Sequence, residues 1–201
     1  MAEPKMIYNL CYTEKYDIED FDGRRLFLNS EVDEDVITTI AYHILRYNRL
    51  DKGIPVEERK PILLYLNSPG GSVADGWGVI DAILSSKTPI YTINQGTCAS
   101  MAFAIFIAGH KRFTMKHGEF LMHDGSTFTW DSTAKAKDRL DFETNELERH
   151  MREYVINRTS IDEKLYEEKY RVEWYMTADT AKQYGVCDYI VGEDCDIDEI
   201  I

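Results

Sequence analysis

The sequence predicts an α/β fold with a parallel sheet. Strand-like, turn-like and helix-like segments alternate between residues 62 and 107, which is typical of parallel strands joined by right-handed crossovers. Residues 62–66 (ILLYL) form a continuous apolar run, as expected for a strand that helices cover on both faces. The length of 201 residues, with 44% hydrophobic and 29% charged residues, suits one domain, which we place at residues 21–201.

The first elements follow an N-terminal arm at residues 1–20, which mixes tyrosines with charged residues and has no period. Residues 25–28 (RLFL) predict a short strand. The acidic residues 33–35 can cap a helix after it. The apolar stripe of this helix consists of Val36, Ile40, Ile44 and Leu45.

The middle of the chain predicts a strand at residues 62–66 that ends at the glycine turn of residues 70–71. A helix is then expected over residues 72–84. Its apolar side chains near helical spacing are Val73, Trp77, Ile80 and Leu84. A strand at residues 90–93 follows, and the apolar residues 99–108 predict a buried helix.

Two further short strands are predicted at residues 111–114 and 119–122, and we interpret the polar turn between them as a hairpin. Residues 132–157 are polar and favour a helix, so we expect one long, half-exposed helix there. Its apolar residues at three- and four-residue steps are Leu140, Leu147, Met151 and Tyr154.

The last unit begins at Thr177, a plausible N-cap, and its short helix stops at Gly185. A strand is predicted at residues 189–191. The acidic tail of residues 193–199 is expected to be solvated.

Charge and cysteine content exclude several classes of function. A net charge of -13 disfavours binding to nucleic acid or to anionic lipid. The four cysteines have neither the close pairs of a zinc site nor the density of a disulfide scaffold, so we expect reduced thiols in a cytoplasmic protein without a metal or a cofactor. No secretory signal is visible, and the apolar run of residues 99–108 is about half the length of a membrane span.

Two strand ends carry small residues just before a helix, where open α/β sheets bind ligands. At Gly70 and Gly71 the backbone N–H groups can turn outward and form an oxyanion hole, although a tight turn explains adjacent glycines equally well. Ser100 stands at the head of the apolar helix, where it is either a nucleophile or a helix cap.

A nucleophilic serine needs a general base, and the chain has five histidines. His123 follows the predicted strand of residues 119–122 and precedes a loop, so its imidazole can face a cleft at a strand end. Packing or surface roles suffice for the others, which are His43, His110, His117 and His150.

Four segments taken together resemble the proteolytic subunit of the Clp protease (ClpP), a family of serine peptidases. They are residues 66–73 (LNSPGGSV), 98–102 (CASMA), 121–123 (LMH) and 175–178 (YMTA) continuing to Tyr184 and Gly185. The resemblance covers residues 25–191. It implies the ClpP and crotonase-like fold, with a parallel sheet, a short second sheet and a long protruding handle helix at about residues 132–157.

The resemblance also implies a mechanism, in which Ser100 attacks the peptide carbonyl and His123 transfers the proton. The N–H groups of Gly71 and Met101 would hold the oxyanion. Family members cleave unfolded polypeptides inside stacked heptameric rings, and an ATPase of the AAA+ class of the Clp type feeds those chains in. The N-terminal arm would line the axial pore.

Three departures from the family pattern stand out. The position of the catalytic aspartate is occupied by Glu173, whose extra methylene moves the carboxylate. The charged pair that usually precedes it and links the rings is replaced by Arg171 and Val172. The loop after His123 lacks the glycine-rich strand of the family. These departures favour a divergent paralogue, which acts in a homo-oligomer or in a mixed ring with a more typical subunit. Asp124 and Asp179 are alternatives to Glu173 as the third catalytic residue.

Three other functions compete with an active serine endopeptidase. A catalytically weak or silent subunit of a mixed ring would keep the fold and have an impaired triad. An acyl-CoA enzyme of the crotonase type would share the fold and the oxyanion hole, but its chain is usually longer at the C-terminus. A signal-peptide peptidase would use a serine and lysine pair and a membrane anchor, and no anchor is visible.

Overall fold

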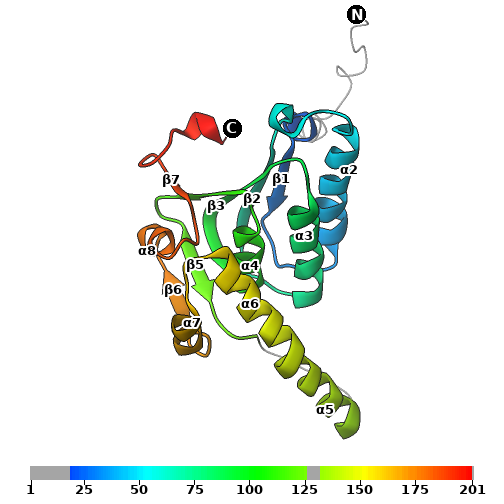
Figure 1. The fold of residues 1–201 in the computed structure, drawn as a ribbon, viewed down its shortest axis with the longest axis vertical. Coiled ribbons are helices and arrows are strands. Elements are labelled where there is room, and N and C mark those ends of the chain that lie inside the picture. The colour runs from blue at the N-terminus through cyan, green and yellow to red at the C-terminus, as the bar shows by residue number, and fades with distance from the viewer. Residues whose placement is uncertain (1–18, 126–131, 201) are drawn as a thin grey trace, which may run out of the picture.

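The computed structural model describes residues 19–125 and 132–200 and has an α/β architecture, as predicted (Figure 1). One seven-stranded sheet contains a parallel core in the order β1-β2-β3-β4-β7. These strands are β1 (Arg25–Leu28), β2 (Ile62–Ser68), β3 (Ile90–Ala99), β4 (Lys111–Met115) and β7 (Tyr189–Val191). The arm expected at residues 1–20 falls almost entirely outside the described residues.

The long strand β3 has different neighbours along its two halves. Tyr91–Asn94 pairs with β4, whereas Thr97–Ala99 pairs in parallel with β5 (Glu119–Met122). The short strand β6 (Trp174–Met176) then runs antiparallel to β5. The hairpin interpretation of residues 111–122 is therefore wrong, because β4 and β5 each pair with β3. The expected second sheet is likewise not separate, since β3 joins it to the first.

The helices between the first strands supply a large part of the apolar core. A π-helical turn (Ile37–Ala41) leads into α2 (Tyr42–Leu50), and α3 (Val73–Ser85) lies beside it (Figure 1). All residues of α4 (Met101–Ile107) are buried, so the apolar run forms a core helix as predicted. A short 3-10 turn (Val56–Glu58) precedes β2.

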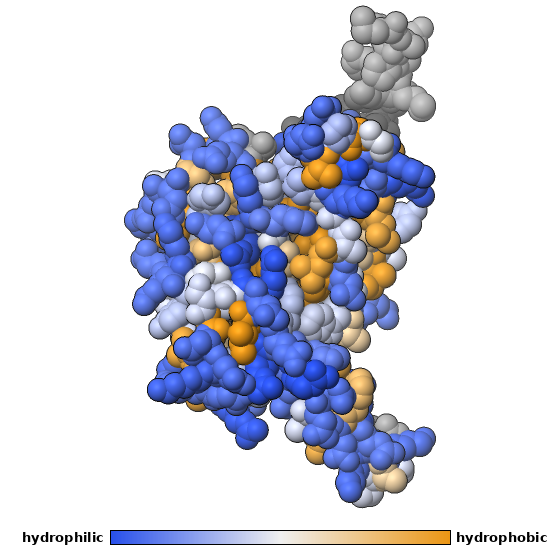
Figure 2. Space-filling view, in the orientation of Figure 1, coloured by the Kyte–Doolittle hydropathy of each residue, from blue (hydrophilic) through white to orange (hydrophobic). Residues whose placement is uncertain are grey.

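The predicted apolar stripes of α2 and α3 are only partly buried. Ile80 is buried, but Val73, Leu84 and Leu45 are 38%, 45% and 58% exposed. Val79 and Ile83 of α3 face the core instead, so its buried face is rotated relative to the predicted stripe. Figure 2 shows apolar side chains gathered on the surface over α2 and α3.

The helix expected over residues 132–157 consists of three consecutive segments, α5 (Thr133–Phe142), a π-helical turn (Glu143–Leu147) and α6 (Glu148–Arg158). Figure 1 shows α6 against the body and α5 projecting away from it. Tyr154 of α6 is half-buried and donates a hydrogen bond to the Ala104 carbonyl at 2.9 Å, whereas no residue of α5 is buried.

The C-terminal part contains α7 (Glu163–Lys169), which the sequence pattern did not predict, and α8 (Ala178–Gln183). Thr177 caps α8 and Gly185 follows it with φ 65°, as predicted. The acidic tail of residues 193–199 is exposed as expected, except for the half-buried Cys195. A 3-10 turn (Ile197–Glu199) brings Ile200 back onto the sheet, where it is buried, and the Tyr65 hydroxyl donates to its carbonyl at 2.5 Å.

Candidate active site

The candidate residues meet at one edge of the sheet. Because β2, β3 and β5 are parallel, their carboxyl ends lie on the same side. The glycine turn follows β2, Ser100 follows β3 and His123 follows β5. The order of the strands therefore brings together three segments that are separate in the sequence.

Ser100 occupies a strained turn between β3 and α4. Its φ of 53° and ψ of -121° are unusual for a residue with a side chain. The Ser100 N–H donates to the Leu121 carbonyl of β5 at 2.9 Å, which fixes the turn against the neighbouring strand. Its side chain makes no capping hydrogen bond to α4, so the helix-cap interpretation is wrong. The hydroxyl also bonds to no other residue that the structure describes.

The glycine turn packs directly against this serine. A Cβ atom on Gly70 would come within 2.6 Å of the Ala99 carbonyl oxygen and 2.9 Å of the Met101 nitrogen. Two hydrogen bonds hold the turn to Val32, and they use the Gly70 carbonyl and the Ser72 N–H. Neither bond uses the N–H of Gly71. The N–H of Met101, the first residue of α4, lies ahead of the helical hydrogen-bond ladder.

His123 lies beside Glu173, although 50 residues separate them. The antiparallel register pairs Met122 with Trp174, so the residues next to this pair face each other. The distance from His123 Nδ1 to Glu173 Oε1 is 3.1 Å, and the two side chains are 28% and 56% exposed. Neither Asp124 nor Asp179 hydrogen-bonds to His123.

The second carboxylate oxygen of Glu173 accepts a hydrogen bond from the Tyr175 hydroxyl at 2.9 Å. Hydrogen bonds from Tyr175 and, to a smaller extent, from His123 lower the pKa of Glu173 below its usual value. Glu173 is therefore a carboxylate at neutral pH. The sequence analysis missed Tyr175, although its position two residues after Glu173 on a strand places both side chains on one face.

The hydrogen bond expected between Ser100 and His123 is not formed. Among the described residues, none joins the Ser100 hydroxyl to His123. Of the other histidines, His110 accepts the Ile90 N–H at 3.1 Å through Nδ1, which is a packing role. Burial lowers the pKa of His43, whose buried Nδ1 has no partner in the described part of the chain.

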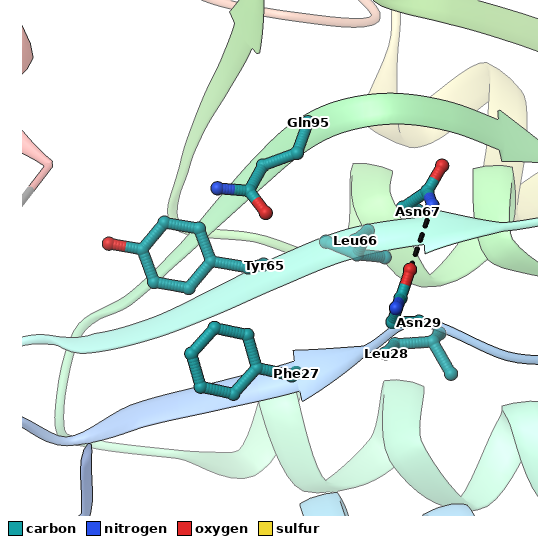
Figure 3. A pocket seen from close by; sticks show the side chains of 7 residues that line it. All are labelled: Phe27, Leu28, Asn29, Tyr65, Leu66, Asn67 and Gln95. Carbon is teal, nitrogen blue, oxygen red and sulfur yellow. Dashed lines mark hydrogen bonds between the residues drawn. The ribbon is translucent and has the colours of Figure 1, made fainter. Parts of the chain in front are cut away.

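One cavity lies apart from these residues, on the strands β1 to β3 (Figure 3). It measures about 380 Å³, and the rings of Phe27 and Tyr65 stack on one side of it with centroids 5.3 Å apart. Asn67 donates to Asn29 at 2.8 Å beside it, and Gln95 faces the space (Figure 3). A groove between α3 and α6, lined by Trp77 and His150 among others, measures about 500 Å³. Neither space is lined by Ser100, His123 or Glu173.

The described residues contain no group of three or more histidine, cysteine, aspartate or glutamate side chains that could hold a metal ion. None of their helices combines the length and the apolar character needed to cross a bilayer.

Comparison with known proteins identifies the family. A sequence model of the Clp protease family matches residues 14–194. The ATP-dependent Clp protease proteolytic subunit 3 of Synechococcus sp. (strain CC9605) is 33% identical over 176 residues, which cover 84% of this chain and 82% of the relative. Proteins named as proteolytic subunits of the same protease from Corynebacterium diphtheriae and Bacteroides thetaiotaomicron are each 29% identical over 84% of this chain, and the matches cover 82% and 74% of those relatives. The chain belongs to the Clp protease family.

Proposed function

We propose that this chain is a proteolytic subunit of an ATP-dependent Clp protease and acts as a serine-type endopeptidase. The observation that carries the proposal is Ser100, which stands in a strained strand-to-helix turn with a hydroxyl that caps nothing. The pair of His123 and Glu173 at the neighbouring strand end supplies the other two groups that such a serine needs.

In this mechanism the Ser100 oxygen attacks the peptide carbonyl carbon while His123 Nε2 accepts the hydroxyl proton. Glu173 holds the Nδ1–H, so that Nε2 carries the free electron pair. His123 then gives the proton to the leaving amine. In the second half, a water molecule attacks the acyl-serine and gives a proton to His123, which returns it to the Ser100 oxygen as the peptide acid leaves.

The developing oxyanion would lie against the N–H groups of Gly71 and Met101. Both groups stand at the carboxyl edge of the sheet beside Ser100, since Gly70 packs against the first residue of α4. The Ser100 hydroxyl must come within hydrogen-bond distance of Nε2 during the reaction, and catalytic hydrogen bonds often tighten only when substrate binds.

The assembly that we propose is a homo-oligomer of stacked heptameric rings, or a mixed ring with a paralogue, in the cytoplasm. The projecting helix of residues 133–158 would act as the handle between rings, because α5 leaves the body and presents Leu140 and Phe142 to solvent. The fold would be crotonase-like, and the arm of residues 1–20 would face the axial pore. An AAA+ ATPase of the Clp type would deliver unfolded polypeptides, and neither nucleic acid nor a membrane takes part.

A second candidate, a weak or silent subunit of a mixed ring, draws on two observations. The aspartate of the family pattern is replaced by the longer and half-exposed Glu173. The Ser100 hydroxyl also makes no hydrogen bond with His123. Such a subunit would contribute its surface to the ring while a partner subunit cleaves.

The test is labelling with a fluorophosphonate probe and turnover of a fluorogenic peptide by the purified assembly, whose size is measured in parallel. We expect Ser100→Ala to abolish labelling and to lower turnover more than about a thousandfold, and Glu173→Ala to lower it at least about a hundredfold. Ser85→Ala, at the exposed end of α3, is the matched control and should retain activity. An assembled ring that neither labels nor cleaves would reject the active enzyme in favour of the silent subunit.

A further inference from the structure

Tyr175 is a surface residue whose hydroxyl has one specific contact. The residue is 66% exposed on the short strand β6, opposite Leu121 of β5. Among the described residues no aromatic ring stacks on it. Its hydroxyl donates to Glu173 Oε2 at 2.9 Å. Packing therefore gives little reason for a large aromatic side chain here, and the contact with the carboxylate gives a specific one.

The geometry of the strands explains why Tyr175 and Glu173 are in contact. Side chains two residues apart on a strand point to the same face, so Tyr175 and Glu173 are neighbours on one face of the β5 and β6 pair. The register places His123 on that same face opposite Glu173. The three side chains form a line in which the carboxylate lies between the hydroxyl and the imidazole.

The carboxylate needs this second partner because of its length and exposure. A glutamate has one more rotatable bond than the aspartate of the family pattern, and holding it in one geometry costs side-chain entropy. Glu173 is 56% exposed, so packing restrains it weakly. With Oε1 on His123 and Oε2 on Tyr175, both oxygens are held at once.

We propose that Tyr175 is a positioning residue, whose hydroxyl fixes the Glu173 carboxylate so that a glutamate can orient His123 in place of an aspartate. The inference rests on the proposed peptidase function. Tyr175 does not touch the reacting atoms and acts through Glu173.

The first test is Tyr175→Phe, which removes only the hydroxyl. With a fluorogenic peptide we expect kcat to fall about three- to tenfold, as for the loss of one hydrogen bond, and KM to stay unchanged. Tyr189→Phe removes a hydroxyl from another strand of the same sheet and should leave both constants unchanged. A Tyr175→Phe enzyme with the kcat of the parent chain would overturn the proposal.

A double-mutant cycle separates positioning from general packing. In the Glu173→Ala background the carboxylate is absent, so Tyr175→Phe should cause no further loss of kcat. If Tyr175→Phe lowers kcat by the same factor in both backgrounds, the hydroxyl acts independently of Glu173 and the proposal is wrong.

The contact between Tyr175 and Glu173 can also be measured without following peptide turnover. The hydrogen bond to Glu173 raises the pKa of the Tyr175 hydroxyl, and Glu119 adds a smaller effect through its charge. In NMR titration of tyrosines labelled with ¹³C at Cζ, Glu173→Ala should lower the midpoint of Tyr175, and Glu119→Gln should lower it less. An unchanged midpoint in Glu173→Ala would reject the contact. Turnover that survives Ser100→Ala would instead reject the proposed function, so the two failures are distinct.

Discussion

At Gly70 the backbone of the glycine turn lies so close to the start of α4 that a side chain does not fit. Its φ is 94°, and an added Cβ atom would come within 2.7 Å of the Ser100 Cβ atom. Gly53 has the same φ of 94°, but an added Cβ atom there would meet nothing within 4 Å. Alanine substitutions at the two glycines therefore distinguish the cost of a left-handed backbone from the cost of a steric clash at the site.

The first prediction uses this pair. Gly53→Ala should lower the free energy of unfolding by about 1–2 kcal/mol, the cost of a left-handed residue with a Cβ atom. Gly70→Ala should lower it by about 3 kcal/mol or more, because the clash adds to that cost, and it should abolish labelling of Ser100 by the probe. Urea unfolding and probe labelling measure the two effects. Equal losses of stability in both variants would show that the turn relaxes without moving the serine.

The candidate site was predictable from the sequence only in part. Ser100 was selected because it stands at the head of a predicted apolar helix and His123 because it follows a predicted strand, and the structure keeps both positions. The contact of His123 with Glu173 depends on the register of β5 against β6, so no local pattern indicated it and only the family resemblance named Glu173. The strained φ of Ser100 was equally invisible, because the hydrogen bond that its N–H makes to Leu121 involves a neighbouring strand.

Among the secondary-structure elements, β4 pairs with β7 and also carries a side chain that contacts three parts of the C-terminal half. Arg112 forms a bidentate ion pair with Asp188, and its shortest contact is 2.5 Å. The same guanidinium donates to the carbonyls of Arg158 at 2.7 Å and Gly185 at 2.8 Å. Arg112 therefore links β4, the end of α6 and the turn after α8.

Removal of this guanidinium should destabilise the protein. Arg112 is only 14% exposed, and Arg112→Met would leave two carbonyls without this donor. Asp188 would lose the guanidinium and keep only the backbone N–H of residue 112, at 2.8 Å. Because Asp188 is 32% exposed, we expect a loss of about 2–3 kcal/mol, below the usual cost of breaking a fully buried pair. Arg149→Met removes only exposed helical pairs and should change the free energy of unfolding far less. Chemical denaturation measures both, and similar losses would contradict the linking role of Arg112.

The strands at residues 111–115 and 119–122 show where sequence reasoning about elements fails. Their existence followed from composition, but their pairing with β3 is non-local, and a hairpin was the simpler interpretation. The exposed Leu45 and Leu84 show a similar failure. Both fit an apolar helical stripe, but which face of a helix is buried depends on the elements that pack against it.

On the scale of the whole molecule, a polar cluster joins the start of the sheet to the helical layer. Asp51 follows α2 and is 1% exposed, and Arg24, which precedes β1, donates to both of its oxygens at 2.6 and 2.5 Å. Thr88, just before β3, adds a hydrogen bond at 2.7 Å. Three segments that are distant in the sequence thus share one buried carboxylate.

This cluster makes the stability of the protein depend on pH. The hydrogen bond from Arg24 is the main reason that the pKa of Asp51 lies below its usual value, so the folded state favours the carboxylate over the acid. The stabilisation is fully present above the unfolded pKa of about 4 and is lost as the pH falls through the lower folded value.

Asp51→Asn should therefore lower the free energy of unfolding by about 2–4 kcal/mol at pH 7, since it removes the charge that faces Arg24. As the pH falls below about 4, the parent chain loses stability that the variant lacks from the start, and the difference between them should shrink. Urea denaturation of both chains at pH 7 and at lower pH measures it, and Glu57→Gln on an exposed turn serves as the control. A difference that stays constant with pH would mean that the charge of Asp51 contributes nothing, and that the shape and hydrogen bonds of its side chain stabilise the cluster.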